Sequence, residues 1–254
     1  MTKGINIKRY EFLGLPVDAY ARDEALARVV ELARTPEPSH VLFLNVDVMV
    51  KADKNLALRR AIEHSDISLM DGMPPFKVAL KRGIPLPEKV SGSDFVPALC
   101  AIAESEGLSL FILGGMQGVP EAARDNLLRK YPKLIIAGTC SPKFGFEKNP
   151  MELERINSIL IEAKPDILLV CLSCPKQEIF VEGNKSIYKA PVSISCGATV
   201  DFLAGNVQRA PEWVSRAGLE WLYRFGKEPK RLFRRYFIAS WHFLVMAGRR
   251  SGQV

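Results

Sequence analysis

The sequence predicts an α/β fold in which helices cover both faces of a mostly parallel β-sheet. Several short apolar runs do not alternate with polar residues, and the clearest of them is 167–172. Runs of this kind are typical of strands that are buried on both faces. They alternate with stretches of helical periodicity along most of the chain. A repeated strand–helix alternation favours a doubly wound, Rossmann-like sheet with right-handed crossovers.

The predicted elements follow this alternation from the N-terminus. The first apolar run, 12–17, contains Gly14 and Pro16 and predicts one interrupted strand. Residues 91–94 supply capping groups for a later helix. The predicted strands are 12–17, 41–44, 67–70, 110–113, 134–137, 167–172 and 192–195, and the predicted helices are 18–34, 91–106, 120–130 and 151–163.

Composition and charge divide the chain into two parts. The 254 residues are 48% hydrophobic and 25% charged, as is typical of a folded soluble protein. The net charge of +7 lies near the end, because the segment 224–250 holds eight basic residues and one acidic residue while the remainder is balanced. We therefore expect an α/β catalytic body over residues 1–208 and a helical, basic and aromatic appendage over 209–254.

The appendage has the pattern of two helices, 211–225 and 230–246, in which Trp, Tyr and Phe stand among basic residues. This pattern is typical of a helix that lies in a membrane interface, and its densest apolar stretch is too short to span a bilayer. Packing of these helices on their own body and binding of nucleic acid are the alternatives. We favour an anionic membrane surface over both.

Cysteine and histidine residues give little sign of a metal centre. The five cysteines are scattered and odd in number, which suits a reducing compartment. Cys171 and Cys174 form a lone C-x-x-C at a strand end, and we interpret them as packing thiols. The three histidines share no ligand spacing and the chain has no D-x-D motif, so we expect neither a metal ion nor a cofactor. A diphosphate would then be held by Lys, Arg and backbone donors.

Polar residues follow the predicted strands at their carboxyl ends, where open α/β sheets bind ligands. Asp71 precedes Gly72 after the strand 67–70, and Asn45 follows the strand 41–44. The two residues lie close together if those strands are neighbours. Asp71 is the best candidate for acid–base chemistry, with capping of the next helix as the alternative. Asp201 has the same two interpretations.

Two further segments carry candidate binding residues. Lys176, Gln177 and Glu178 follow the strand 167–172, where a bound molecule would lie, although an ordinary strand-to-helix loop fits equally well. Gly114 and Gly115 follow the strand 110–113 and would let the backbone approach a phosphate or sugar closely. A plain turn explains them equally well, since the first glycine of G-x-G-x-x-G is missing.

These motifs together resemble the WecG/TagA/CpsF family of bacterial glycosyltransferases. The matching blocks stand in family order, and the PKQE, DFLAG…RAP and EWLYR…EP.R patterns are specific in combination. The blocks are LNVDVMV (44–50), LMDGMPP (69–75), KVSGSDF (89–95), FILGGMQGVPEAA (111–123), PDILLVCLSCPKQE (165–178), GATVDFLAGNVQRAPEW (197–213) and LEWLYRFGKEPKRLFRRY (219–236).

The resemblance implies inverting, metal-independent transfer of a sugar from a UDP-sugar to a saccharide on undecaprenyl diphosphate. It assigns the role of base to Asp71, with Asn45 beside it. It also implies a peripheral protein on the cytoplasmic face of the bacterial inner membrane, and a homo-oligomer is compatible with it. The residues expected at the donor are Lys89, Gly114, Gly115, Lys176, Gln177, Glu178 and Asp201, and those expected at the acceptor diphosphate are Arg224, Arg231 and Arg234.

Departures from the family pattern concern the donor sugar more than the fold. Phe43 stands where many members have threonine, and Lys89 replaces an arginine and so loses bidentate reach to phosphate. The residues 171–173 replace a G-x-G, and the usual DG-x-G turn ends on Pro74. Members use N-acetylmannosamine, its uronic acid, glucose, glucuronic acid or other hexoses, and the pattern does not choose among these donors.

Two other functions compete with the glycosyltransferase. The chain could be a non-catalytic, membrane-docked subunit that binds a nucleotide sugar within a polysaccharide assembly complex, although Asp71 and the arginine set argue against this alternative. A nicotinamide oxidoreductase is a third interpretation, which the broken glycine fingerprint disfavours.

Overall fold

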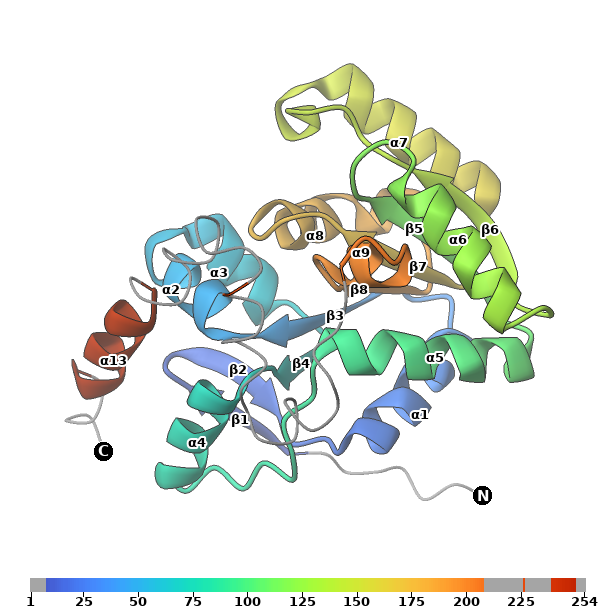
Figure 1. Cartoon of the computed structure of the whole chain (residues 1–254). Coiled ribbons are helices and arrows are strands. Elements are labelled where there is room, and N and C mark those ends of the chain that lie inside the picture. Colours follow the sequence, from blue (N-terminus) through green and yellow to red (C-terminus); the bar gives the residue numbers. More distant parts are fainter. Residues whose placement is uncertain (1–7, 208–225, 227–238, 250–254) are drawn as a thin grey trace.

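The computed structural model describes residues 8–207, 226 and 239–249 (Figure 1). Its elements are, in chain order, β1 (Arg9–Phe12), β2 (Leu15–Asp18), α1 (Arg22–Leu32), β3 (Ser39–Leu44), α2 (Val46–Lys54), α3 (Leu56–Glu63), β4 (Ile67–Met70), α4 (Met73–Lys81), α5 (Gly92–Glu106), β5 (Ser109–Gly114), α6 (Val119–Lys130), β6 (Ile135–Cys140), the 3₁₀ turn η1 (Phe146–Lys148), α7 (Pro150–Ala163), β7 (Ile167–Cys171), α8 (Lys176–Tyr188), β8 (Val192–Ser195), α9 (Thr199–Leu203) and α13 (Ala239–Arg249).

Six of these strands form one sheet in the order β4-β3-β8-β7-β5-β6, and every pair of neighbours in it is parallel. The carboxyl ends of the six strands therefore meet at one edge of the sheet, which we call the carboxyl edge. The predicted α/β fold with a parallel, Rossmann-like sheet is confirmed.

The central strands are buried on both faces, as their unbroken apolar runs predicted. In β7, Ile167 and Leu169 belong to one hydrophobic cluster, whereas Leu168 and Val170 belong to another. Successive side chains of a strand point to opposite faces, so the two clusters lie on opposite sides of the sheet. Helices α1, α5, α6 and α9 pack on the first side, and α2, α3, α7 and α8 cover the second (Figure 1).

The prediction for the N-terminal strand is wrong. Residues 12–17 do not form one interrupted strand but span the turn between β1 and β2. Leu13 and Gly14 adopt φ values of 53° and 67°, and two successive residues with positive φ make the tight turns that join antiparallel strands. Leucine rarely occupies such a position, so the residue types did not signal the turn. Because β2 extends to Asp18, the next helix begins at Arg22 rather than near residue 18.

The other elements predicted within residues 8–207 are confirmed with shifts at their ends. Ser91 is the N-cap of α5, and Gly107, with a φ of 66°, ends this helix just after Glu106. Glycine is favoured at such a left-handed position because it has no Cβ. Strand β6 continues to Cys140, three residues further than predicted.

Helix α13 is the described part of the appendage. It packs against α2 and buries Phe243, Met246 and Ala247 in the cluster that also holds the core of α2. The guanidinium of Arg82, after α4, donates to the carbonyl oxygen of Ala247. Trp241 lies on the other side of α13 and is exposed. One face of the helix is therefore fixed to the body while the other is open.

Several predictions about the appendage fall outside the described residues. These are the domain boundary near residue 208, the helix 211–225, the first part of the helix 230–246, and the residues Arg224, Arg231 and Arg234. In the ranges that the structure does describe, no helix combines the length and the apolar character that crossing a bilayer requires.

Candidate active site at the carboxyl edge of the sheet

Asp71 and Asn45 are neighbours at the carboxyl edge. Strands β3 and β4 pair in parallel up to Leu44 and Met70, so Asn45 and Asp71 are the next residues on the two chains. The backbone N–H of Asp71 donates to the carbonyl oxygen of Leu44 at 2.9 Å. Both residues are half-buried. The predicted closeness of these two residues is thus confirmed.

Neither candidate aspartate occupies the N-cap position of a helix. Gly72, with a φ of 97°, occupies the N-cap of α4, so Asp71 lies one residue before the cap. Ala198 is the N-cap of α9, and Asp201 lies inside that helix. Capping is instead the role of Asn45, whose side-chain oxygen accepts from the backbone N–H of Val48 at the start of α2. The oxygen of this amide is thereby held in a fixed orientation.

Lys89 lies beside the same strand end. The backbone N–H of Val90 donates to the carbonyl oxygen of Met70 at 2.8 Å, which holds the segment 89–90 against the last residue before Asp71. Lys89 is half-buried. The backbone of this segment therefore runs beside the strand end that carries the candidate base.

Gln177 joins two loops at the centre of the edge. Its side-chain oxygen accepts from the backbone N–H of Gly197, after β8, at 3.0 Å, and its side-chain nitrogen donates to Glu178 at 2.7 Å. Gln177 is 5% exposed and Glu178 is 2% exposed. The structure therefore places Gln177 as a bridge between the loops that follow β7 and β8, with Glu178 in the core behind it.

The burial of Glu178 has an electrostatic consequence. Burial raises the pKa of the Glu178 carboxyl above its usual value, and the hydrogen bond from Gln177 works in the opposite direction. Across the loop, the ammonium of Lys51 donates to the carbonyl oxygen of Cys174 at 3.0 Å and to Asp47 at 2.8 Å. These contacts tie α2 to the loop that precedes α8.

Lys176 is engaged away from this bridge. Its ammonium lies 2.8 Å from Glu147 and 5.2 Å from the centre of the Phe144 ring, both in the connection between β6 and α7. Within the KQE segment, Gln177 therefore contacts the loop after β8, whereas Lys176 contacts the connection after β6. Sequence reasoning could not separate the three, because all follow the same strand.

Packing inside the protein explains both Gly114, the last residue of β5, and Gly115, which follows it. A Cβ added to Gly114 would lie 2.4 Å from the carbonyl oxygen of Cys171, and one added to Gly115 would lie 3.2 Å from Val119. Both residues also have positive φ, 121° and 80°. Close approach of β5 to β7 therefore requires Gly114 whether or not a donor binds there. Contact of these glycines with a donor stays a prediction.

Cys171 lies next to a different cysteine from the one that the C-x-x-C spacing suggests. Its sulfur lies 3.4 Å from that of Cys196, and both thiols are buried and reduced. The two residues follow paired positions of β7 and β8. The adjacency depends on the strand order, which spacing along the sequence does not reveal. In the part of the chain that the structure describes, no three His, Cys, Asp or Glu side chains group as a metal site would require.

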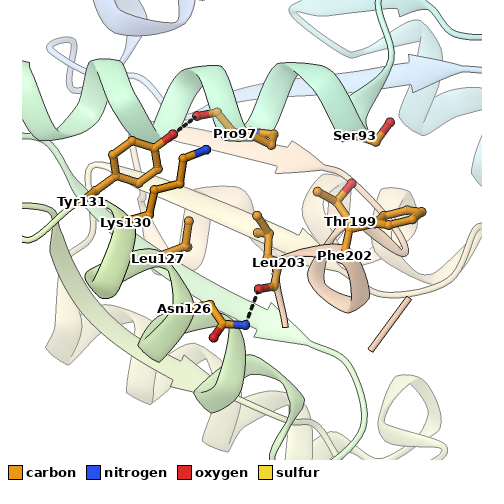
Figure 2. Close-up of a pocket in the computed structure, with 9 residues that line it drawn as sticks. All are labelled: Ser93, Pro97, Asn126, Leu127, Lys130, Tyr131, Thr199, Phe202 and Leu203. Atoms are coloured by element: carbon orange, nitrogen blue, oxygen red, sulfur yellow. Dashed lines mark hydrogen bonds between the residues drawn. The ribbon is translucent and has the colours of Figure 1, made fainter. Parts of the chain in front are cut away.

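A pocket of about 240 Å³ opens between α5, α6 and α9 (Figure 2). Tyr131 donates to the carbonyl oxygen of Pro97 at 3.3 Å, and Asn126 donates to that of Leu203 at 2.9 Å, so both polar side chains help to hold the walls together. Sequence reasoning missed the pocket, because helices far apart in the chain form it. Its lining is mostly apolar and consists of Ser93, Pro97, Asn126, Leu127, Lys130, Tyr131, Thr199, Phe202 and Leu203.

Comparison with known proteins agrees with this geometry. The model of the glycosyl transferase WecG/TagA/CpsF family matches residues 10–253. The chain belongs to this family. It is 26% identical over 211 residues to the N-acetylglucosaminyldiphosphoundecaprenol N-acetyl-beta-D-mannosaminyltransferase of Bacillus spizizenii, a match that covers 83% of this chain and 80% of the relative. The resemblance inferred from the motifs is therefore confirmed.

In this member of the WecG/TagA/CpsF family, the sequence blocks that lie within residues 8–207 gather at one edge of the sheet. Because the strand order is β4-β3-β8-β7-β5, the residues that follow these strands stand in the order Asp71, Asn45, Gly197, the loop before Gln177, and Gly115. The blocks are separated along the sequence, and the parallel topology brings their ends together.

The family departure at Phe43 is accommodated inside the core. The Phe43 ring is buried and meets Phe95 edge to face, with 5.6 Å between the ring centres. A Cβ on Gly92 would lie 3.3 Å from the Phe43 ring and 3.6 Å from the hydroxyl of Thr199. Glycine at the start of α5 thus lets this helix lie close to the aromatic ring. The Phe43 ring thus fills the space between β3 and the start of α5.

Proposed function

We propose that this chain transfers a hexose-type sugar from a UDP-sugar to a saccharide on undecaprenyl diphosphate, with inversion and without a metal ion. The observation that carries the proposal is the pairing of Asp71 with Asn45 at the ends of two adjacent strands. Membership of a glycosyl transferase family supports the reaction class. The name of the Bacillus spizizenii relative supports a lipid-linked acceptor and N-acetylmannosamine as the first donor sugar to test.

Asp71 is the proposed base. In a single displacement, its carboxylate removes the proton from the attacking hydroxyl of the acceptor as that oxygen bonds to the anomeric carbon. The bond from the anomeric carbon to UDP breaks on the opposite side, so the configuration inverts. The short link from β4 and the backbone bond to Leu44 support this role, because a base must be held within hydrogen-bond reach of the proton it takes.

The departing UDP carries the negative charge that develops. We assign Lys89 to this charge, because the next residue, Val90, is bonded through its backbone to Met70, which precedes Asp71. We assign Arg224, Arg231 and Arg234 to the diphosphate of the acceptor, as the family resemblance implies. Fixed donors of this kind stabilise a developing charge without a divalent ion.

We propose that the nucleoside of the UDP-sugar donor binds in the pocket between α5, α6 and α9. Its volume of about 240 Å³ is below the roughly 300–1,000 Å³ of pockets that enclose a drug-sized ligand, so it suits one moiety of the donor. The side chains of Phe202 and Thr199 supply an aromatic face and a hydroxyl. Asp201 stands between them in the sequence, and Gln177 braces the loop that leads into this helix.

A lipid-linked acceptor places the reaction at a membrane. We propose a peripheral enzyme at the cytoplasmic face of the bacterial inner membrane, held there by the basic charge of the segment 224–250. The exposed Trp241 on α13 supports this orientation, because Trp is enriched at membrane interfaces.

The proposal is tested by incubating the purified full chain with a panel of UDP-sugars and a short-chain prenyl diphosphate that carries N-acetylglucosamine. Mass spectrometry of the products should show the acceptor enlarged by one hexose-type unit, together with one UDP per transfer. Binding of UDP-sugars without any release of UDP would instead support a non-catalytic subunit.

A further inference from the structure

The carboxyl edge carries an exposed apolar side chain that the proposed reaction does not use. Phe144, in the connection between β6 and α7, is fully exposed. Met116, after β5, is 80% exposed on the adjacent loop. The hydroxyl of Ser141 donates to the carbonyl oxygen of Met116 at 3.3 Å, which ties the two loops together. Two large apolar groups therefore project from joined loops at the edge where the site lies.

Phe144 is held in this position by a braced turn. The backbone N–H of Phe146 donates to the carbonyl oxygen of Lys143, and the N–H of Lys143 donates to the buried carboxylate of Glu152 at 3.2 Å. Phe146 itself is buried against Phe180, with 6.2 Å between the ring centres. One phenylalanine anchors the turn while the other projects from it, so the exposure of Phe144 is built into the fold.

Basic residues lie in the same connection as the projecting ring and, in the case of Lys176, against it. Lys143 and Lys148 are exposed on the same connection, and the ammonium of Lys176 lies over the Phe144 ring. Glu147, the exposed acid of this connection, is paired with Lys176 at 2.8 Å. An exposed apolar group among cations matches the boundary between the anionic headgroups and the acyl chains of a bilayer.

We propose that Phe144 inserts into an anionic membrane surface and forms a second contact, separate from the C-terminal segment. The inference rests on the proposed function, because only a lipid-linked acceptor requires this edge to face a bilayer. Helix α13 supports the orientation: it packs on α2, which begins at the carboxyl edge, and leaves Trp241 and Leu244 exposed (Figure 1). Exposed apolar side chains thus lie on α13 as well as on the connection that carries Phe144.

The test measures how the full chain partitions onto vesicles of equal parts phosphatidylcholine and phosphatidylglycerol. Phe144→Ala should weaken partitioning roughly tenfold, since most of a phenylalanine side chain would no longer leave water. Phe144→Trp should retain it, because tryptophan suits the headgroup region. Ile187→Ala is the matched control, because Ile187 is 51% exposed at the far end of α8 and should have no effect.

Two activity readouts separate this inference from the proposed function. Phe144→Ala should keep its turnover on a water-soluble, short-chain acceptor and lose turnover on a long-chain acceptor in vesicles. A wild-type chain that binds vesicles through Phe144 but transfers no sugar would overturn the proposed function alone. Equal partitioning of Phe144→Ala and wild type would overturn the membrane contact. The membrane contact would also be overturned if light scattering without vesicles showed an oligomer that dissociates in Phe144→Ala.

Discussion

The bridge made by Gln177 can be removed without changing the size of the side chain much. Gln177→Met deletes the acceptor for the N–H of Gly197 and the donor to Glu178, which lie at 3.0 Å and 2.7 Å in the native chain. A neutral hydrogen bond contributes about 0.5–1.5 kcal/mol, and one to a charged group about 1.5–3 kcal/mol. We expect the free energy of unfolding to fall by about 2–4 kcal/mol, which lowers Tm by roughly 5–15 °C.

The loss of stability in Gln177→Met should depend on pH, because Gln177 bonds the ionisable carboxyl of Glu178. Burial already raises the pKa of this carboxyl, and removal of the Gln177 donor raises it further. Because its folded-state pKa is raised, Glu178 stabilises the folded protein at pH values below its unfolded pKa of 4.5. This stabilisation is lost as pH rises through the folded-state pKa. The difference between variant and wild type should therefore be larger near about pH 8 than near about pH 5.

Urea unfolding of both chains at the two pH values measures the effect. Gln117→Met is the matched control, because Gln117 is exposed on the loop after β5 and its replacement should change stability little. A loss below about 0.5 kcal/mol that is also independent of pH would show that the bridge does not hold the two loops.

Three further predictions concern the core, the glycine turn and the chemistry. Burial lowers the pKa of His40 to about 3, from 6.5, so the stability from its neutral form should be lost as pH falls from about 6.5 towards 3, by up to about 1.4 kcal/mol per pH unit. The His40→Gln variant should lack this contribution to the pH dependence of the free energy of unfolding. Gly114→Ala should destabilise by more than about 3 kcal/mol through its clash with the carbonyl of Cys171, whereas Gly118→Ala, with open space around it, should cost about 1–2 kcal/mol. Thermal melts that rank the two glycine variants equally would contradict the packing reason. Turnover should survive excess EDTA, and a collapse that Mg²⁺ or Mn²⁺ restores would refute metal independence.

The predictable parts of the fold are those in which the residues of one segment determine by themselves how that segment is buried. An unbroken apolar run must be buried on both faces, so strands such as 167–171 were found from their residues alone. Asp71 and Asn45 could be paired because consecutive strands tend to be neighbours in a sheet. The N-terminal hairpin was missed because Leu13 adopts a positive φ that leucine rarely takes.

The remainder of the site depends on distant segments. Strand β8 comes last among the described strands and lies between β3 and β7. This order brings Cys196 to Cys171 and Gly197 to Gln177. Glu178 was expected at the donor or in an ordinary strand-to-helix loop, yet it is buried on α8. The pocket between α5, α6 and α9 depends on side chains such as Tyr131, whose surroundings no local pattern encodes.

Turnover of Asp71→Asn tests the central claim most directly. If Asp71 takes the proton from the acceptor hydroxyl, kcat should fall by roughly 10²–10⁴-fold. The amide keeps the size of the side chain and the backbone bond to Leu44, so affinity for UDP and Tm should be nearly unchanged. Near-wild-type kcat in this variant, with UDP affinity and Tm intact, would contradict the assignment of the base and with it the proposed chemistry of the site.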